Sequence, residues 1–317
     1  MQADLSLLMI GYLLKTTLQM GTPIILAALG GMFSEKAGIV NIGLEGMMLT
    51  GAFTAVVVTA FTGNPWLGLL IGAGAGGLLS LVHAIMCVKF KGNHIVSGTG
   101  MILLGFGITT LGLQVVWGIR GRSDEVTGID NVVLEGLQGV PVLGTAFSSL
   151  SPVIYLMFII VIACWYVIYK TPFGLRLRAA GEDPSTLDTA GVNVDTYRII
   201  GVLLSGVLAG LGGAYLSVGY ENAFAKNMTN GRGFIGLAAM IFGNWTPIGC
   251  LLAGLFFGFL GGLEYALQIG LGNEVVGAYL SFIQMLPYIL VVVALAGIRK
   301  SVPPKAVGIP YETEKHG

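Results

Sequence analysis

Residues 66–88 read WLGLLIGAGAGGLLSLVHAIMCV, a run without a single Asp, Glu, Lys or Arg. About 20 predominantly apolar residues are enough for a helix to cross the hydrocarbon core of a bilayer. Gly68, Gly72 and Gly76 recur every four residues in this run and therefore share one helix face. Small residues on one face let a neighbouring helix approach closely in a membrane. The stretch predicts a membrane-spanning helix that packs tightly against another.

The whole composition supports the same class of protein. Of 317 residues, 55% are hydrophobic, only 10% are charged and 50 are glycine, whereas a soluble chain carries about 25% charged residues. Acidic and basic residues balance at 16 each, so bulk charge predicts no nucleic acid polymer as a partner. The three cysteines lie inside apolar runs and are interpreted as packing residues, not as a disulfide framework or a metal site.

Eight apolar runs are long enough to span a membrane, and a ninth is shorter. The eight cover residues 7–30, 44–62, 66–88, 94–117, 152–170, 197–219, 248–269 and 278–297. The ninth, 233–243, is too short to cross straight and is interpreted as a broken or re-entrant segment. The predicted fold is all-α: a polytopic transmembrane helical bundle of eight or nine spans, forming one domain over 1–300 with a short extended tail over 301–317.

The distribution of basic residues predicts how the bundle is oriented. If the spans alternate, eleven Lys and Arg residues fall on one side, four on the other, and Lys15 lies within the first span. Cytoplasmic loops carry the excess of basic residues. The N-terminus is therefore predicted outside and the C-terminus inside, with 118–151 as an external loop and 171–196 as a cytoplasmic loop.

Motifs for catalysis are lacking in the sequence. It contains no G-x-x-x-x-G-K-[ST] phosphate loop, no H-E-x-x-H and no C-x-x-C. His83 and His94 are interpreted as packing or interfacial residues. The chain is therefore predicted not to be an enzyme and to need no metal or cofactor. A membrane-embedded enzyme is the alternative only if Glu264, Lys15 or a histidine proves essential for turnover.

The predicted cytoplasmic loop contains a short helix signal, TPFGLRLRAAGEDPSTLDTAG over residues 171–191. Asp183 suits the N-cap, Pro184 the first helical position and Gly191 the left-handed turn that ends a helix. A helix of about two turns over Pro184–Ala190 would be unstable alone in water. It is therefore predicted to dock on another surface, the alternative being an ordinary connector helix packed on its own chain.

This loop resembles the coupling segment of permeases from ATP-binding-cassette importers for branched-chain amino acids and simple sugars. Two further stretches, SEKAGIVNIGLEGMMLTGAF over 34–53 and GRGFIGLAAMIFGN over 231–244, are similar to the nucleoside importer branch of that family. The resemblance extends from the first span to Arg299. Members of the family often have a basic residue where Asn244 stands, so a charge-based role is not carried over to that position.

The resemblance implies a permease subunit in the cell membrane that passes nucleosides inward by alternating access. The implied partners are membrane lipid, a second permease subunit forming a heterodimer, a cytoplasmic ATP-binding-cassette ATPase, and an external substrate-binding lipoprotein or periplasmic protein. The alternatives are import of ribose or another simple sugar by the same machinery, and a self-sufficient channel or ion-coupled carrier. Residues matching the coupling pattern are assigned to ATPase contact: Gly181, Glu182, Asp183, Ala190 and Gly191.

Candidate residues for the translocation pathway come from two glycine-bounded apolar pieces, 41–48 and 234–243. Interrupted helices in matching halves of a transporter often end near the bilayer midplane. The first piece offers Asn41 and Glu45; alternatively, Asn41 caps a helix starting near Ile42 and Glu45 lies in its first turn. Phe234 and Asn244 mark the ends of the second piece.

A second pair of pathway candidates lies at the external end of a predicted span. Gln114 and Trp117 are three residues apart and share a helix face. An aromatic ring with an amide could stack on and hydrogen-bond a purine, although an interfacial belt is also a common place for tryptophan. Glu264 and Gln268, four residues apart, either line a lumen or contact another subunit.

Overall fold

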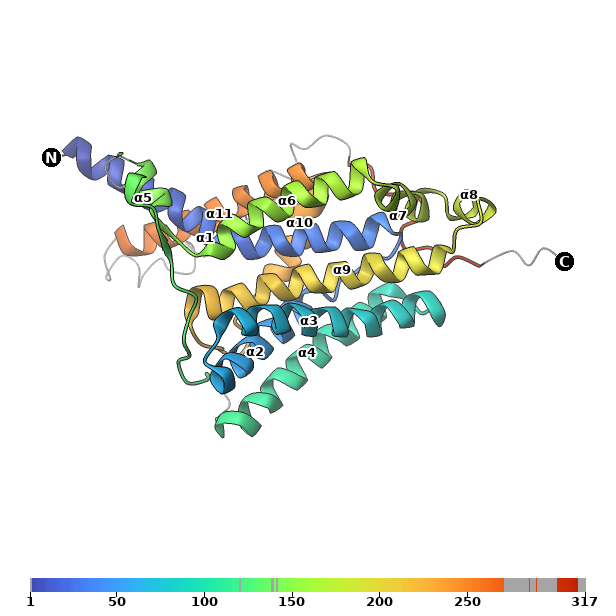
Figure 1. Cartoon of the computed structure of the whole chain (residues 1–317), viewed down its shortest axis with the longest axis horizontal. Coiled ribbons are helices and arrows are strands. Elements are labelled where there is room, and N and C mark those ends of the chain that lie inside the picture. The colour runs from blue at the N-terminus through green and yellow to red at the C-terminus, as the bar shows by residue number, and fades with distance from the viewer. Residues whose placement is uncertain are drawn as a thin grey trace.

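The computed structural model describes residues 2–119, 121–137, 140, 142–270, 285, 289 and 301–312. Seven helices run roughly along one axis (Figure 1). They are α1 (Gln2–Lys36), α2 (Leu44–Thr62), α3 (Pro65–Ala84), α4 (His94–Trp117), α6 (Pro152–Lys170), α9 (Val194–Ala214) and α11 (Pro247–Gly270). π-Helical turns extend α3 over Ile85–Lys89 and α9 over Tyr215–Glu221.

Four shorter helices complete the helical structure of the described residues: α5 (Leu143–Phe147), α7 (Pro172–Glu182), α8 (Pro184–Thr189) and α10 (Arg232–Phe242). Strands β1 (Val132–Val133) and β2 (Ser149–Leu150) pair antiparallel, and a 3₁₀ turn covers Glu135–Leu137. The predicted external loop is therefore partly ordered into a small β pair. The bundle itself is helical, as predicted.

In the described part of the chain, seven helices are long and apolar enough to cross a membrane. They match seven of the eight predicted runs, and the eighth, 278–297, lies outside the described residues except for positions 285 and 289. The first span was predicted too short, because α1 continues to Lys36. Its last turns are buried inside the bundle, where Glu35 accepts a hydrogen bond from Trp245.

Glycines set the close helix contacts that the four-residue spacing predicts. A Cβ atom added to Gly76 of α3 would lie 2.5 Å from the Gly206 carbonyl oxygen of α9. A Cβ on Gly258 of α11 would lie 2.5 Å from the Thr17 carbonyl oxygen of α1. Any larger residue would push these helices apart, so the glycine faces are confirmed as packing surfaces.

The bundle has two distinct ends, which we name after the helices found there. At the α5 end lies α5 with the N-terminus, and at the α8 end lie α7, α8 and residues 301–312 (Figure 1). At the α5 end, the backbone N–H groups of Ser123 and Val126 donate to the carbonyls of Phe224 and Asn222. The predicted external loop is thereby tied to the segment that follows α9.

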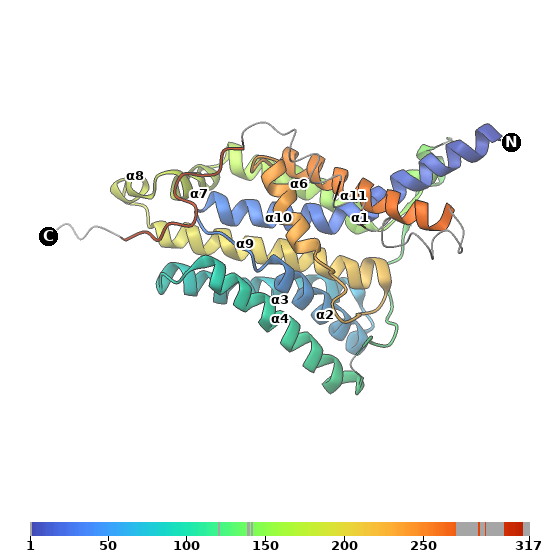
Figure 2. The ribbon, with the colours of Figure 1, turned by 180° about the vertical axis from the view of Figure 1, so that it is seen from behind.

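Two non-helical segments enter the bundle. Residues 37–43 leave α1 at the α8 end and run to the start of α2 in the interior (Figure 2). Residues 222–231 leave the π-helical turn after α9 and lead into α10. The backbone N–H and C=O groups of these two segments lie away from water and must find hydrogen-bond partners within the protein. The residues that supply those partners form the candidate functional site.

The loop 171–196 differs from its prediction. It was expected to hold one isolated helix, but α7 precedes α8 directly. Thr171 caps α7 through its hydroxyl, which accepts from the Gly174 N–H at 3.1 Å, and Pro172 occupies the first turn. The helix predicted over Pro184–Ala190 forms as α8, with Asp183 as its N-cap.

Candidate functional site

The start of α10 is anchored by a carboxylate from another helix. Glu45 Oε1 accepts from the Thr229 hydroxyl at 2.6 Å and from the Gly231 N–H at 2.8 Å, while Oε2 accepts from the Gly233 N–H at 2.7 Å. The first N–H groups of a helix lack partners within it, and its N-terminus attracts negative charge. Glu45, only 1% exposed, supplies both the acceptor and the charge.

This arrangement explains why the sequence starts α10 without a side-chain cap. Gly231 occupies the N-cap position with φ +80°, a left-handed conformation that favours glycine. It has no side chain to offer to the helix N–H groups. A Cβ on Gly233 would lie 2.5 Å from the Glu45 backbone nitrogen, so the absence of side chains lets α2 and α10 meet.

Asn41 does not play the capping role that was considered for it. The helix starts at Leu44, and Gly43 at its N-cap makes no side-chain cap bond. Asn41 is fully buried and its Nδ2 donates to Ser205 Oγ at 2.9 Å. The start of α2 is displaced because residues 37–43 are non-helical and mostly buried. The Asn41 side chain therefore bonds Ser205 of α9, and its Nδ2 also lies 3.4 Å from Met47 Sδ. Within the described residues its Oδ1 has no hydrogen-bond partner.

The two histidines support the same buried segment. His83 Nε2 lies 3.1 Å from the Val40 carbonyl oxygen, and His94 Nδ1 accepts from the Val40 N–H at 3.3 Å. Ser34 Oγ donates to the Ile39 carbonyl at 2.7 Å. These side chains satisfy the backbone that 37–43 leave without helical bonds. The two histidines therefore pack inside the bundle and hydrogen-bond the backbone of Val40.

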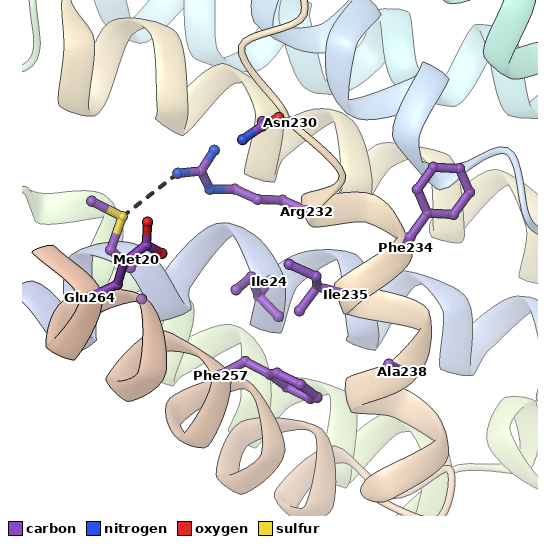
Figure 3. Close-up of a pocket in the computed structure, with 10 residues that line it drawn as sticks. Met20, Ile24, Asn230, Arg232, Phe234, Ile235, Ala238, Phe257 and Glu264 are labelled. Carbon is purple, nitrogen blue, oxygen red and sulfur yellow. Dashed lines mark hydrogen bonds between the residues drawn. The ribbon is translucent and has the colours of Figure 1, made fainter. Parts of the chain in front are cut away.

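A cavity of about 320 Å³ lies beside the first turns of α10. It is lined by Met20 and Ile24 of α1, Arg232 and Phe234 of α10, and Phe257 and Glu264 of α11 (Figure 3). Arg232 donates through Nη1 to the Met228 carbonyl at 3.1 Å, and its Nη2 lies 3.7 Å from Met20 Sδ. The same turn that Glu45 holds therefore positions Arg232.

The other end of α10 forms a tight turn over Gly243–Thr246. Asn244 and Trp245 both have positive φ, +50° and +53°. Trp245 is buried and its Nε1–H donates to Glu35 Oε2 at 2.6 Å. Asn244 is exposed and its Oδ1 accepts from the Val302 N–H at 3.0 Å. Asn244 thus contacts the tail at the α8 end, far along α10 from Phe234.

The tail crosses the α8 end and is hydrogen-bonded to several elements. It was predicted to be extended, but residues 305–308 form turns, with the Val307 N–H donating to the Pro304 carbonyl at 3.2 Å. The Ala306 N–H donates to the Gly181 carbonyl at 2.8 Å, and the Gly308 N–H to the Gly38 carbonyl at 3.0 Å. Tyr311 donates through its hydroxyl to Asp188 of α8 at 2.9 Å. The tail therefore joins the turn after α10 to the segment assigned to ATPase contact.

The predicted coupling residues divide into buried and exposed positions. Gly181 is buried, and a Cβ there would collide with the Lys36 carbonyl oxygen of α1. Glu182, Asp183, Ala190 and Gly191 are exposed at the α8 end. Gly191 adopts φ +75°, the left-handed conformation predicted for it. Four of the five residues therefore form an accessible surface, and Gly181 instead fixes α7 against α1.

Asp183 is held in its charged form by its own helix. The Thr186 hydroxyl donates at 2.6 Å, the Ser185 hydroxyl at 2.7 Å and the Thr186 N–H at 3.2 Å. These hydrogen bonds lower the pKa of Asp183 from its ordinary 3.8 to about 2. The carboxylate is therefore a fully charged cap at neutral pH.

Gln114 and Trp117 lie apart from these groups, in the last turn of α4 away from the α8 end. Trp117 packs edge-on against Phe53 of α2, with ring centroids 6.3 Å apart. Phe53 in turn contacts Phe224, at 5.3 Å. The structure joins Glu45 and Phe234 through one turn of α10, but it leaves the other pathway candidates in separate places.

Sequence reasoning missed the role of Arg232 and the Glu35–Trp245 pair. Arg232 was counted only as a basic residue bounding the short apolar piece. Its position in the sequence could have predicted this role. Arg232 stands between two glycines at the start of an apolar helix, so it lies close to the bundle interior. Glu264, predicted to line a lumen or contact another subunit, lies beside the cavity. The side chain of Gln268 lies outside the described residues.

Comparison with known proteins adds evidence from sequence. The family described as "Branched-chain amino acid transport system / permease component" matches residues 13–297. The guanosine ABC transporter permease protein NupQ of Bacillus subtilis is 41% identical over 312 residues, covering 94% of this chain and 96% of its own. The nucleoside ABC transporter permease protein NupC of Lactococcus lactis is 42% identical over 307 residues, covering 93% and 94%.

A third relative comes from an archaeon. TsgC13 of Haloferax volcanii, provisionally named as a glucose ABC transporter permease protein, is 38% identical over 260 residues, 81% of this chain and 78% of its own. No solved structure matches the chain significantly.

Proposed function

The chain belongs to the family of branched-chain amino acid transport system permease components, and from that premise we propose that it forms part of the membrane pathway of an ATP-driven nucleoside importer. It is a multi-pass membrane protein and a transport subunit, not an enzyme. The observation that carries the substrate class is the 41–42% identity, over more than nine-tenths of the chain, to permeases named for guanosine and nucleosides.

The proposed orientation places the α8 end in the cytoplasm and the N-terminus outside. The excess of basic residues on that side supports it. Glu182, Asp183, Ala190 and Gly191 would then face an ATP-binding-cassette ATPase, which hydrolyses ATP on a separate chain. A second permease subunit, distinct from this one, and an external substrate-binding protein complete the proposed assembly.

Uptake of labelled solutes tests the proposed function directly. Cells with and without this chain are supplied with guanosine, adenosine, uridine or ribose. Loss of nucleoside uptake upon deletion, with ribose uptake intact, is the expected result. Loss of ribose uptake alone would overturn the nucleoside assignment while keeping the permease role.

Import of a simple sugar is the second candidate, because TsgC13 shows that the family similarity reaches a protein named for glucose. Excess unlabelled guanosine should compete with labelled nucleosides, and excess ribose or glucose should not. The third candidate, a self-sufficient channel or ion-coupled carrier, is tested with the purified chain in vesicles. Movement of guanosine by this chain alone, without an ATPase, would overturn the importer proposal.

The ATPase contact is tested at α8. Ala190→Arg places bulk and charge on the exposed end of that helix. We expect it to leave folding intact, to prevent co-purification of the ATPase and to abolish uptake. Gly136→Arg is the matched control, because it lies in the loop over 118–151 and a Cβ there meets open space. Normal ATPase co-purification with Ala190→Arg would overturn the assignment.

A further inference from the structure

We propose that the cavity beside the first turns of α10 is a resting site for a nucleoside within this permease. The proposal rests on the proposed function for its ligand, but it adds a location and a set of residues. The cavity is bounded by the three helices α1, α10 and α11 and by Asn230 in the segment before α10. At about 320 Å³ it falls within the range of about 300–1,000 Å³ typical of small-molecule sites.

The position of the cavity along the bundle suits a translocation pathway. Met20 and Ile24 belong to the middle of the candidate span Met9–Lys36, so the wall of the cavity formed by α1 lies deep in the transmembrane region. α10 begins at this level instead of crossing from one side to the other. Transporter substrate sites are commonly built where a discontinuous helix starts near the midplane.

The lining offers two kinds of contact to one ligand. Arg232 and Glu264 lie on the same side of the cavity, near Met20, whereas the rings of Phe234 and Phe257 lie away from Met20 (Figure 3). An aromatic ring can stack on a nucleobase, and guanidinium and carboxylate groups can bond hydroxyls and base edges. A nucleoside has one flat aromatic part and one hydroxylated part, which matches this division.

A lipid chain is a poor occupant for such a cavity. Ionisable residues deep in a membrane are costly and normally face protein or water. Arg232, at the start of α10, and Glu264, at the end of the candidate span Pro247–Glu264, both border the cavity. Phe234 is 47% exposed in this single chain. A nucleoside in a wet pathway could hydrogen-bond Arg232 or Glu264 and cover one of the aromatic rings.

Glu45 of α2 holds the turn that carries Arg232 and Phe234 in place. The carboxylate of Glu45 binds the Thr229 hydroxyl and the N–H groups of Gly231 and Gly233. These residues flank Arg232 and precede Phe234 directly. Glu45 is therefore a positioning residue, which fixes the turn without lining the cavity itself. Fixed supporting bonds keep ligand contacts within a narrow geometry.

Thiol labelling tests the site in the assembled transporter reconstituted in nanodiscs. Ala238→Cys places a thiol in the cavity wall, and the native cysteines Cys87, Cys164 and Cys250 are all buried. A water-soluble thiol reagent should label the new cysteine, and guanosine should protect it. Gly136→Cys in the exposed loop over 118–151, where a Cβ meets open space, is the control, whose labelling guanosine should not alter.

A second substitution separates ligand contact from simple access. In the Ala238→Cys background, Phe234→Ala should raise the guanosine concentration that gives half protection by about ten-fold, because a stacking partner is lost. Ile241→Ala, on the same helix but outside the cavity, should leave that concentration unchanged.

Each outcome of the labelling decides the proposal. Labelling without protection by guanosine, or no labelling because lipid or the second permease covers the cavity, would overturn it. Protection that Phe234→Ala leaves unchanged would also overturn it. If the wild-type assembly imports guanosine and the cavity is not protected, the resting site fails and the proposed function stands. If the assembly imports no nucleoside, the proposed function fails first.

Discussion

The two ends of α10 are held by different kinds of contact. At its start, a buried carboxylate from α2 receives two backbone N–H groups and one hydroxyl. At its end, one buried bond joins Trp245 to Glu35, and one exposed bond joins Asn244 to the backbone of the tail. The start is therefore fixed inside the bundle, whereas the end is shared between the interior and the surface at the α8 end.

This difference indicates where motion can enter. A turn held by several buried hydrogen bonds to one charge resists displacement, because breaking them leaves buried polar groups without partners. A turn held partly by exposed contacts can exchange them with water at low cost. The tail that contacts Asn244 also contacts α7 and α8. Displacement of α8 would therefore reach the end of α10 before it reached the start.

The largest effect is expected from Glu45→Ala. This change removes the acceptor of three buried or half-buried donors, so we expect a loss on the order of 3 kcal/mol in the free energy of unfolding. Thermal unfolding of the purified assembly measures it. Glu45→Gln retains one acceptor oxygen and should lose clearly less. Equal stability of Glu45→Ala and wild type would refute the anchoring role of this carboxylate.

A smaller effect is expected at the other end of α10 from Trp245→Phe. An aromatic ring remains, but the buried Glu35 carboxyl loses the hydrogen bond that Trp245 Nε1–H donates at 2.6 Å. We expect a loss of about 2 kcal/mol in the free energy of unfolding. Trp165→Phe is the matched control because Trp165 lies 37% exposed on α6. If both changes cost the same, the Glu35–Trp245 contact contributes nothing and the end of α10 is held only by packing.

The helices of the bundle were predictable because each is encoded locally. The lengths of the apolar runs predicted the membrane spans, and the four-residue spacing of glycines predicted the packing faces of α3, α9 and α11. α7 could have been predicted as well, since Thr171–Pro172 carries the same cap signature as Asp183–Pro184. The length of α1 could not, because its last turns are polar enough to resemble a loop and are stabilised by Trp245, far along the chain.

The candidate site was predictable only in part, because its key contacts join distant residues. The sequence placed Glu45 in the first turn of its helix, which the structure confirms. It could not show that the partner of Glu45 is the start of α10. One signal was present: Gly231 at the N-cap offers no side chain, so the acceptor for α10 had to come from another element. Asn41 shows the same limit, since its partner Ser205 lies on α9.

The exposed contact at the end of α10 should be weaker still. Asn244→Gly removes the acceptor for the Val302 N–H while keeping a residue that tolerates the positive φ. We expect a loss of about 0.5 kcal/mol or less in stability, but faster protease cleavage in the tail. Asn222→Gly, at another position with positive φ, controls for the change in backbone freedom. Unchanged cleavage would mean that Asn244 does not hold the tail.

The smallest effect on the bundle as a whole is expected at α8, where the anchoring group is fully exposed. The lowered pKa of Asp183, about 2 in place of 3.8, means that its capping contribution is complete above pH 4 and disappears as the pH falls through 2. Hydrogen exchange of the peptide over 183–191 should therefore be faster in Asp183→Ala than in wild type. Asp183→Asn keeps an acceptor oxygen and should resemble wild type.

The pH dependence sharpens this test. After correction for intrinsic exchange, the difference between wild type and Asp183→Ala should stay constant from pH 5 to pH 8, because Asp183 does not titrate there. A difference that changes within this window would show that another group controls α8. A constant difference, together with unchanged thermal unfolding of the bundle, would mean that α8 is stabilised by its own cap and can move without loosening the buried anchor at Glu45.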